Sequence, residues 1–330
     1  MDVKSKITGL FFLLCCCFSN AQFVKNHGQL KLEGTQLVDT HGEDVVLRGL
    51  SFGWHSFWPR FYNEKAVKWL KKDFKCNVVR AAMGIEVGDK PYLKEREFSK
   101  AKVKAVIEGA IQADIYVIID WHSHNINLEE AKEFFAEMSK IYGRYPNVIY
   151  EIFNEPDYES WEEIKAYSEE VIKVIRENDL DNIILVGCPK WDQDIHLPAA
   201  NPIKGFDNLM YTMHFYAGTH GKWLRDRTDD AIKSGLPVFV SESAGMQATG
   251  DGPLDHESWQ DYIDWMESRK LSWITWSVSD KDETCSILRK SAKTEGKWKK
   301  NDLKESGVKI RSLLRHYNGK TGQIDHPIPV

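Results

Sequence analysis

Residues 148–156 read VIYEIFNEP, an apolar run, Val148–Phe153, followed at once by Asn154, Glu155 and Pro156. A short, nearly continuous apolar run is typical of a strand that is buried on both faces of a parallel sheet. The polar residues that follow it would then lie at the carboxyl end of that strand. The segment therefore predicts a buried strand with an amide and a carboxyl at its exit.

Seven further runs of this kind occur along the chain, and helical segments alternate with them. The eight runs are Val45–Ser51, Asn77–Met83, Tyr116–Trp121, Val148–Phe153, Ile183–Val186, Leu209–Phe215, Val238–Ser241 and Ser272–Ser277. The segments with helical period are Glu64–Phe74, Ser99–Ala113, Leu128–Tyr142, Trp161–Asn178, Lys222–Ser234, His256–Ser268 and Leu303–Tyr317. Eight regular repeats predict an α/β fold of the closed (β/α)8 type, the TIM barrel. No Gly-rich phosphate fingerprint follows the first strand, which disfavours a dinucleotide-binding fold.

An N-terminal hairpin precedes the first barrel strand. Leu30–Glu33 and Gln36–Asp39 flank Gly34-Thr35, a turn-forming pair between two short runs. We expect this hairpin to close the bottom of the barrel. The chain shows no Ser/Thr/Pro-rich linker and no internal repeat, so we expect residues 22–330 to form a single catalytic domain.

The first 21 residues have the pattern of a secretory signal peptide. Lys4 and Lys6 precede the apolar run Ile7–Phe18, and Ser19–Ala21 supplies the small and polar residues of a cleavage site. The run is too short to span a bilayer comfortably. We therefore expect a secreted protein that is not held in a membrane, with simple cleavage favoured over a lipid anchor on Cys15–Cys17.

Composition limits the classes of partner. After cleavage three cysteines remain, Cys76, Cys188 and Cys285, at wide spacings that match neither a dense disulfide framework nor a metal-ligand pair. We expect buried thiols and no cofactor. A net charge of −5 argues against nucleic acid as a partner. Twelve tryptophans in an exported chain favour carbohydrate, because flat aromatic faces match the apolar faces of sugar rings. We expect a monomer.

Polar and titratable residues gather where the strands end, and the carboxyl ends of barrel strands form the active site. These positions are Arg80, Asp120–His124, Asn154, Glu155, His214–Tyr216, Ser241–Ser243 and Trp276. Six strand ends of one barrel converge on one pocket, so these side chains predict a single site. Asp120 and Glu151 lie within strand runs, and we expect them to be buried structural partners.

Glu155 and Glu242 are the pair that predicts the chemistry. Hydrolysis of a glycoside with retention needs a protonated carboxyl at the leaving oxygen and a carboxylate at the anomeric carbon, about 5–5.5 Å apart. Arg80 and Tyr216 could keep Glu242 ionised, and desolvation could keep Glu155 protonated. Asn154 could donate to the sugar 2-hydroxyl.

The strand-end motifs resemble those of family 5 glycoside hydrolases, and within them the bacterial endoglucanases, or cellulases. The segments that carry the resemblance are Val79–Met83, Ile118–His122, Tyr145–Pro156 and Trp276–Lys281, in the family's order and spacing. The resemblance implies a barrel that hydrolyses β-1,4-glucan within the chain, with retention, Glu155 as acid/base and Glu242 as nucleophile.

The same resemblance assigns substrate contacts residue by residue. It places Arg80, His122, Asn154, Glu155, His214, Tyr216, Glu242 and Trp276 at the cleavage subsite. Trp191 would stack a sugar on the leaving-group side, and Lys281 would contact sugars on the non-reducing side. The family often has a histidine soon after Arg-Gly on the first strand, and His55 is the nearest substitute here.

Three alternatives remain open at this point. The same mechanism could act on mannan, xylan or mixed-linkage glucan, because specificity depends on loop geometry. His122-x-His124 could be a metal pair in a metal-dependent barrel hydrolase, although no matching Asp/His set appears on strand one or eight. A non-catalytic sugar-binding relative is disfavoured by Glu155 and Glu242. Fold analogy alone does not choose among these.

Overall fold

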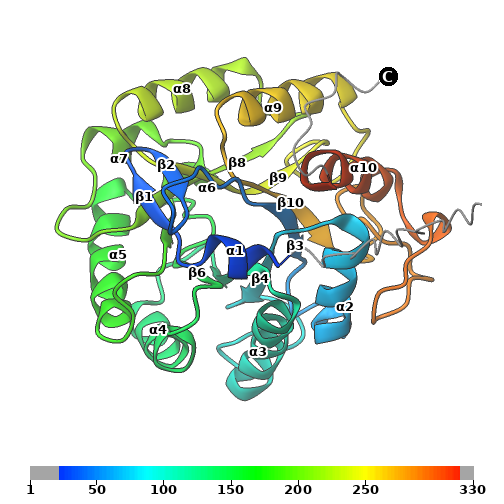
Figure 1. The fold of residues 1–330 in the computed structure, drawn as a ribbon, viewed down its shortest axis with the longest axis horizontal. Coiled ribbons are helices and arrows are strands. Elements are labelled where there is room, and N and C mark those ends of the chain that lie inside the picture. Colours follow the sequence, from blue (N-terminus) through cyan, green and yellow to red (C-terminus); the bar gives the residue numbers. More distant parts are fainter. Residues whose placement is uncertain (1–21, 320–330) are drawn as a thin grey trace, which may run out of the picture.

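Eight parallel strands close into a barrel in the computed structural model, which describes residues 22–319 (Figure 1). In order around the barrel, the strands are β10 (Trp273–Val278), β3 (Arg48–Phe52), β4 (Val78–Gly84), β5 (Tyr116–His122), β6 (Val148–Glu151), β7 (Ile184–Val186), β8 (Leu209–Tyr216) and β9 (Val238–Ala244). Each of the eight predicted apolar runs contributes one strand. The predicted α/β barrel is therefore confirmed.

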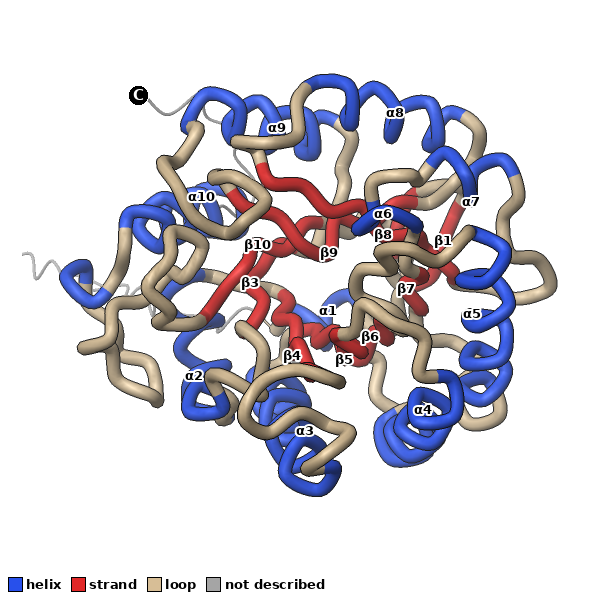
Figure 2. Tube along the Cα trace, turned by 180° about the vertical axis from the view of Figure 1, so that it is seen from behind, coloured by secondary structure: helices blue, strands red, loops and turns tan. Residues whose placement is uncertain are grey.

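Helices surround the barrel on its outer face (Figures 1 and 2). They are α2 (Glu64–Trp69), α3 (Arg96–Ala113), α4 (Leu128–Tyr142), α5 (Trp161–Arg176), α7 (His196–Ala200), α8 (Lys222–Lys233), α9 (His256–Ser268) and α10 (Glu305–Gly319). The short segment α6 (Pro189–Asp192) lies inside this ring, next to β8 (Figure 2). Local sequence fixes where several of them begin. Ser160 and Glu163 form a capping box at the start of α5, and Asn63 accepts a hydrogen bond from the Ala66 amide at the start of α2.

Two predicted segments differ in detail from the structure. The first strand begins at Arg48 instead of Val45, because Leu37 and Val38 of the hairpin pair with the chain just before it. The predicted helix Glu64–Phe74 is α-helical only to Trp69 and continues as a π-helical turn, Leu70–Phe74.

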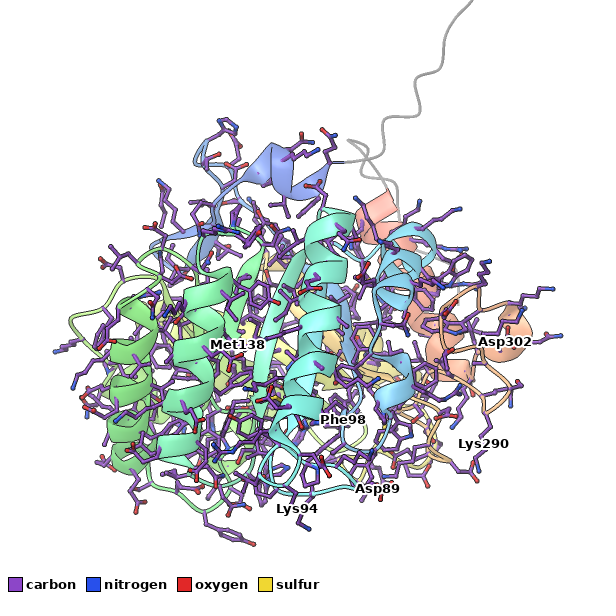
Figure 3. The ribbon with its side chains drawn as sticks, turned by 90° about the horizontal axis from the view of Figure 1, so that it is seen from below. Asp89, Lys94, Phe98, Met138, Lys290 and Asp302 are labelled. Atoms are coloured by element: carbon purple, nitrogen blue, oxygen red, sulfur yellow. The ribbon has the colours of Figure 1, made fainter. Side chains whose placement is uncertain are left out.

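The N-terminal hairpin closes one end of the barrel, as predicted. Its strands are β1 (Lys31–Glu33) and β2 (Gln36–Val38), preceded by the short helix α1 (Phe23–His27). Leu30 and Leu37 are buried against a cluster of apolar side chains from the barrel strands. Figure 3 shows α1 and the hairpin at one end of the molecule and the loop that carries Asp89 and Lys94 at the other. The site therefore has to open at the end opposite the hairpin.

The interior of the barrel changes from apolar to charged along the strands. On β4, Val79, Ala81 and Met83 pack in the core beneath the helices, and Val78 belongs to the apolar cluster above the hairpin. Arg80, two residues after Val78, points to the same side because side chains alternate along a strand. The charged layer thus lies above the apolar layer and toward the open end.

The remaining predictions about the chain concern its ends and its cysteines. The predicted signal peptide, residues 1–21, lies outside the described residues and stays a prediction. Between residues 22 and 319, no helix has the length and apolar character needed to cross a membrane. Cys76, Cys188 and Cys285 are buried free thiols, as expected.

Candidate active site

Arg80 on β4 is the centre of a buried charged network. Its Nε lies 2.6 Å from Glu151 Oε2, its Nη2 lies 3.0 Å from Asp120 Oδ2, and its Nη1 lies 2.9 Å from Glu242 Oε2. Nη2 also donates to Asn154 Oδ1 at 2.6 Å. A buried guanidinium is stable only when carboxylates and hydrogen bonds replace its water. Asp120 and Glu151 supply these, as the sequence predicted.

Glu242, near the end of β9, is held by two donors on different strands. Arg80 reaches one carboxyl oxygen, and the Tyr216 hydroxyl donates to Oε1 at 2.7 Å. The side chain is 5% exposed. Burial and the charge of Glu155 raise the pKa of Glu242, and the charge on Arg80 and the Tyr216 hydrogen bond offset part of that rise. The carboxyl is therefore fixed in one orientation at the mouth of the barrel.

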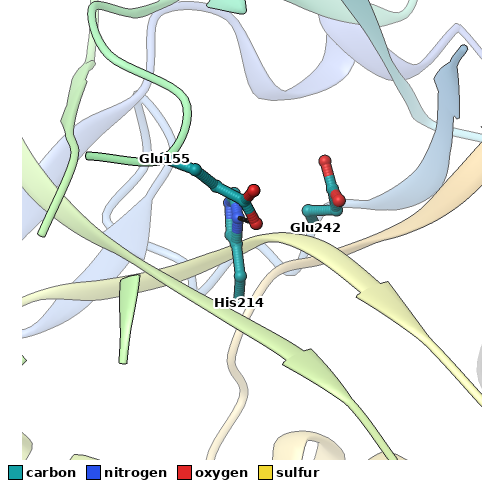
Figure 4. A group of neighbouring side chains, drawn as sticks. All are labelled: Glu155, His214 and Glu242. Atoms are coloured by element: carbon teal, nitrogen blue, oxygen red, sulfur yellow. Dashed lines mark hydrogen bonds and ion pairs between the residues drawn. The ribbon is translucent and has the colours of Figure 1, made fainter. Parts of the chain in front are cut away.

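Glu155 follows β6 and faces Glu242 across the site, with His214 of β8 beside it (Figure 4). His214 Nδ1 lies 2.9 Å from Glu155 Oε1. At least one oxygen of Glu155 lies within 4.8 Å of an oxygen of Glu242. Two carboxyls at about 5–5.5 Å suit attack by one of them on a sugar, whereas inverting enzymes hold theirs about 6.5–9.5 Å apart to admit a water.

The ionisation of Glu155 differs from the expectation that desolvation would keep it protonated. Burial does raise the pKa of Glu155, but the hydrogen bond and the charge of His214 outweigh it and hold the pKa below its usual value. Burial lowers the pKa of His214, yet Asp192, Glu151 and Glu155 together raise it well above the ordinary value. In the resting site the imidazole therefore holds the proton that Glu155 would need as an acid.

An aromatic group lies at the ends of β5 and β10. The rings of His122 and Trp276 stack with centroids 5.1 Å apart and planes 3° from parallel. His122 Nδ1 lies 2.7 Å from Asp120 Oδ2, which fixes the imidazole. Trp54 packs edge-on against His122 at 4.4 Å. The stacked rings leave Trp276 only 7% exposed.

Two of the predicted substrate contacts, Trp191 and Lys281, lie farther from the carboxyl pair and are more exposed. Trp191, on α6, is 40% exposed, and its ring lies 6.4 Å from that of the exposed Tyr158 on the neighbouring loop. Lys281 follows β10, is half-exposed, and pairs with Glu283. Both side chains belong to loops at the open end, where they could meet a long substrate.

The prediction for His55 is corrected by the structure. His55 is fully buried, its Nδ1 accepts a hydrogen bond from the Gly84 amide at 3.0 Å, and its Nε2 lies 2.7 Å from Ser99 Oγ. Both ring nitrogens are used inside the protein, so neither can bind a sugar. Its neighbour Trp54, partly exposed, packs against His122 instead.

A metal ion is the other use that this geometry could suggest. Glu155, His214 and Glu242 each offer one ligand atom, and these atoms lie within 4.8 Å of one another. However, the Arg80 guanidinium already binds Glu242 and would repel a cation, and His214 Nδ1 already faces Glu155. The suggested pair His122-x-His124 is divided: His122 binds Asp120, and His124 Nδ1 lies 3.1 Å from the Glu155 carbonyl oxygen. The arrangement fits acid/base chemistry better.

The structure shows two further partners of His214: Ser241, which is among the predicted strand-end residues, and Asp192, which is not. Ser241 links His214 Nε2, at 2.8 Å, to Glu151, and Asp192 Oδ2 lies 3.2 Å from His214 Nδ1. Ser241 ends a predicted strand just before Glu242, so the motif contained a signal for it. Asp192 lies in a segment for which no strand or helix was predicted, and it carried no such signal.

Comparison with known proteins agrees with this geometry. Residues 38–282 match the cellulase family, glycosyl hydrolase family 5. The chain belongs to that family. Endoglucanase A of Evansella cellulosilytica is 45% identical over 282 residues, which cover 83% of this chain and 57% of the relative. The chain thus matches little more than half the length of that family 5 relative.

Solved structures of similar proteins share the barrel. A structure from Cytophaga hutchinsonii superposes with a TM-score of 0.88 and 43% identity, covering 90% of this chain and 97% of the other. The catalytic domain of an endoglucanase from Thermobifida fusca superposes with a TM-score of 0.83 and 34% identity, covering 88% of this chain and 99% of the other. A variant of the latter domain was solved in complex with cellotetraose.

Proposed function

We propose that the protein hydrolyses β-1,4-glucosidic bonds within cellulose or related β-glucans and retains the anomeric configuration, with Glu155 as acid/base and Glu242 as nucleophile. The observation that carries the proposal is the closeness of the pair: one oxygen of each carboxyl lies within 4.8 Å of an oxygen of the other, nearer than the about 6.5–9.5 Å that inverting enzymes need. The endoglucanase names of relatives and the cellotetraose complex of the Thermobifida fusca domain support a glucan substrate.

In the first step, Glu242 attacks the anomeric carbon and forms a glycosyl ester while the bond to the leaving oxygen breaks. Glu155 gives its proton to that oxygen. In the second step, Glu155 takes a proton from water, the water oxygen attacks the anomeric carbon, and Glu242 leaves as a carboxylate. The side-chain nitrogen of Asn154, which has no partner among the described residues, is a donor available for the sugar 2-hydroxyl.

Chemical rescue tests the assignment of the two glutamates. Glu242→Ala removes the nucleophile, so azide or formate should restore turnover and give a product of inverted configuration. Glu155→Ala removes the acid and later base, so it should still attack aryl glycosides with good leaving groups, and azide should rescue it with retention. Proton NMR of the product anomer reads both results, and Glu151→Gln serves as a control for loss of a buried carboxylate that does not face substrate.

Each outcome has a definite reading. An inverted product from the unmodified enzyme would contradict double displacement. The opposite rescue pattern would exchange the two roles while keeping the pair. Full activity in both Ala variants would remove Glu155 and Glu242 from the chemistry altogether. Activity that is lost with a chelator and restored by a metal ion would favour the metal-dependent alternative.

The polymer is tested by a substrate panel. Reducing-end release from carboxymethylcellulose, mannan, xylan and mixed-linkage glucan should be highest on the β-1,4-glucan, with products longer than a disaccharide early in the reaction. Preferred release from mannan or xylan would keep the mechanism and change the substrate.

We also propose that residues 1–21 direct export and are removed, and that the mature protein is secreted and monomeric. The support is the sequence pattern of residues 1–21. N-terminal sequencing of the mature protein should begin at residue 22, and light scattering should give the mass of one chain.

A further inference from the structure

Asp192 is a buried carboxyl that the proposed mechanism does not use. Its Oδ1 accepts hydrogen bonds from the Cys188 amide and from Thr212 Oγ1, the latter at 2.7 Å. Its Oδ2 lies 3.2 Å from His214 Nδ1 and makes no well-directed hydrogen bond with any described residue. The carboxyl is fully buried, and one of its oxygens faces the imidazole.

An unusual backbone turn puts Asp192 there. Lys190, Trp191 and Asp192 all have left-handed φ values, 54°, 54° and 59°. Such values are uncommon for residues other than glycine, and three in succession are held only where surrounding contacts fix them. The turn directs Asp192 inward toward His214 while Trp191 remains exposed. The same turn therefore positions one side chain inside the site, Asp192, and one at its outer edge, Trp191.

Hydrogen bonds around His214 determine which nitrogen must carry a proton. Burial raises the pKa of Glu151, but the Arg80 charge outweighs it and lowers the pKa to about 2, so Glu151 is ionised and accepts the hydrogen of Ser241 Oγ at 2.7 Å. Ser241 has no second hydrogen to give. The contact of 2.8 Å between Ser241 Oγ and His214 Nε2 therefore needs a hydrogen on Nε2.

His214 Nδ1 then faces two carboxyls, Glu155 Oε1 at 2.9 Å and Asp192 Oδ2 at 3.2 Å. Without a hydrogen between them, a lone pair on Nδ1 would face two carboxylates. One proton must therefore lie on the imidazole, on Glu155 or on Asp192. All three placements give the same net charge of minus one, so the proton can move among them without any change in the total charge of the site.

We propose that Asp192 is a positioning residue that shares the acid/base proton with Glu155 through His214, so that Glu155 can take a proton from the imidazole before it protonates the leaving oxygen. The inference rests on the proposed role of Glu155. With three proton-binding groups and two negative charges, the set loses its last proton at a higher pH than Glu155 and His214 would alone. Asp192 therefore extends the activity of the acid to higher pH.

Other titratable and charged groups face this set from the elements around it. They are Arg80 on β4, His124 after β5, Glu151 on β6, Cys188 before α6, His220 after β8, and Glu242 on β9. Burial raises the pKa of Asp192 to about 8, against the opposing charge of His214. The raised pKa agrees with Asp192 as one of the three groups on which the shared proton can lie.

The test compares the pH dependence of kcat/KM for the full chain and for Asp192→Asn on an aryl cellobioside. The amide keeps the shape but can neither ionise nor release a proton. In Asp192→Asn we expect the decline of kcat/KM at high pH, the basic limb of the profile, to begin about one pH unit lower. At a pH well into that decline, kcat/KM should therefore be about tenfold lower than in the unmodified protein. KM should change little. Asp194→Asn is the matched control, because Asp194 lies in the same segment but pairs with Arg227 and makes no ion pair with His214. It should leave the limb in place.

Nitrogen-15 NMR of the histidine rings gives a second reading that needs no activity. The protein has eleven histidines. The signals of His214 are identified as those that are missing from the spectrum of a His214→Gln variant. Nδ1 of His214 should lose its proton at a lower pH in Asp192→Asn than in the unmodified protein. Unchanged Nδ1 titration together with an unchanged basic limb would reduce Asp192 to a loop anchor and overturn the inference.

Failure of this inference differs from failure of the proposed function. If Glu155→Ala and Glu242→Ala abolish hydrolysis but Asp192→Asn leaves both pH readings unchanged, only the role of Asp192 is wrong. If the glutamate variants retain full activity, the proposed function is wrong, and the NMR titration still reports whether the three groups share a proton. A poorly folded Asp192→Asn is replaced by Asp192→Ser, which lacks the carboxyl and is smaller.

Discussion

Arg80 Nη1 lies 2.9 Å from Glu242 Oε2, and the same guanidinium also binds Glu151 and Asp120. One cation thus faces three buried carboxylates, of which only Glu242 points to the open end. The two other carboxylates fix the guanidinium plane, so the orientation of Glu242 depends on charges that no substrate touches. Removing one partner of such a buried set typically destabilises a protein by about 3–5 kcal/mol.

Arg80→Lys should slow the reaction and shift the acidic limb of its pH–activity profile. Lysine keeps a positive charge but cannot bind Glu151 and Glu242 together through a planar fork. We expect kcat to fall about 100-fold, as for loss of a fixed electrostatic donor. The pKa of Glu242 should rise without the guanidinium, so the acidic limb moves to higher pH. Arg269→Lys, at the surface pair with Asp229, is the control. A change in KM alone would make Arg80 a sugar contact instead.

His55 should make the protein less stable in mild acid. Burial lowers the pKa of His55 to about 4 from an ordinary value of 6.5. The unfolded chain therefore binds a proton below about pH 6.5 that the folded chain binds only near pH 4. The free energy of unfolding is therefore unaffected by protonation of His55 above pH 6.5. It falls as the pH falls from 6.5 toward 4, by about 3 kcal/mol in total. Urea unfolding across that range should show a shallower pH dependence for His55→Gln than for the unmodified protein.

The exposed His41 supplies the control for that measurement, because His41→Gln should leave the pH dependence as it is. His220 is a second buried histidine whose pKa burial lowers to about 4, so His55→Gln should reduce the dependence and not abolish it. An unchanged slope in His55→Gln would mean that the histidine takes up its proton in the folded state at an ordinary pH.

The sequence predicted the barrel and the carboxyl pair because both follow from local patterns. Strand periodicity puts Val78 and Arg80 on one side of β4, and the ends of parallel strands meet at one end of a barrel. Glu155 and Glu242 each follow directly from such a strand end. No knowledge of loop conformation was needed to bring them together.

Loop residues could not be assigned in this way. His55 and Trp54 are adjacent, and only the turn after β3 decides that Trp54 packs on His122 while His55 goes beneath Gly84. Asp192 depends on left-handed φ values at residues other than glycine, which no residue type in the segment requires. Contacts with distant strands, such as the one from Thr212, stabilise that turn, and a single sequence does not display them.

Gly245→Ala should destabilise the end of β9. A Cβ at Gly245 would lie 2.1 Å from the Trp259 ring, so the ring on α9 or the strand must move. Overpacking of this kind costs about 1–3 kcal/mol. The control is Gly221→Ala, where an added Cβ meets only Trp223, at 3.7 Å. Denaturant unfolding should separate the two variants, and equal stabilities would show that Trp259 moves aside without cost.

Trp191 should bind a sugar on the leaving-group side of the cleavage point. Its indole is 40% exposed on the turn that also carries Asp192, and Tyr158 stands beside it. Stacking of an indole on a sugar face contributes binding but takes no part in bond breaking, so Trp191→Ala should raise KM for long oligosaccharides severalfold. Hydrolysis of a short aryl glycoside should be unchanged, because its leaving group does not reach that far.

The matched control for Trp191 is Trp223→Ala. Trp223 is 45% exposed, on α8, so the variant loses an indole of similar exposure from another helix. Kinetics on cellohexaose and the distribution of its products should change in Trp191→Ala and stay the same in Trp223→Ala. A loss of activity on the short aryl glycoside would point instead to a disturbed Asp192, because both residues share one strained turn. Identical kinetics and products in all three proteins would leave Trp191 as a surface residue without a part in substrate binding.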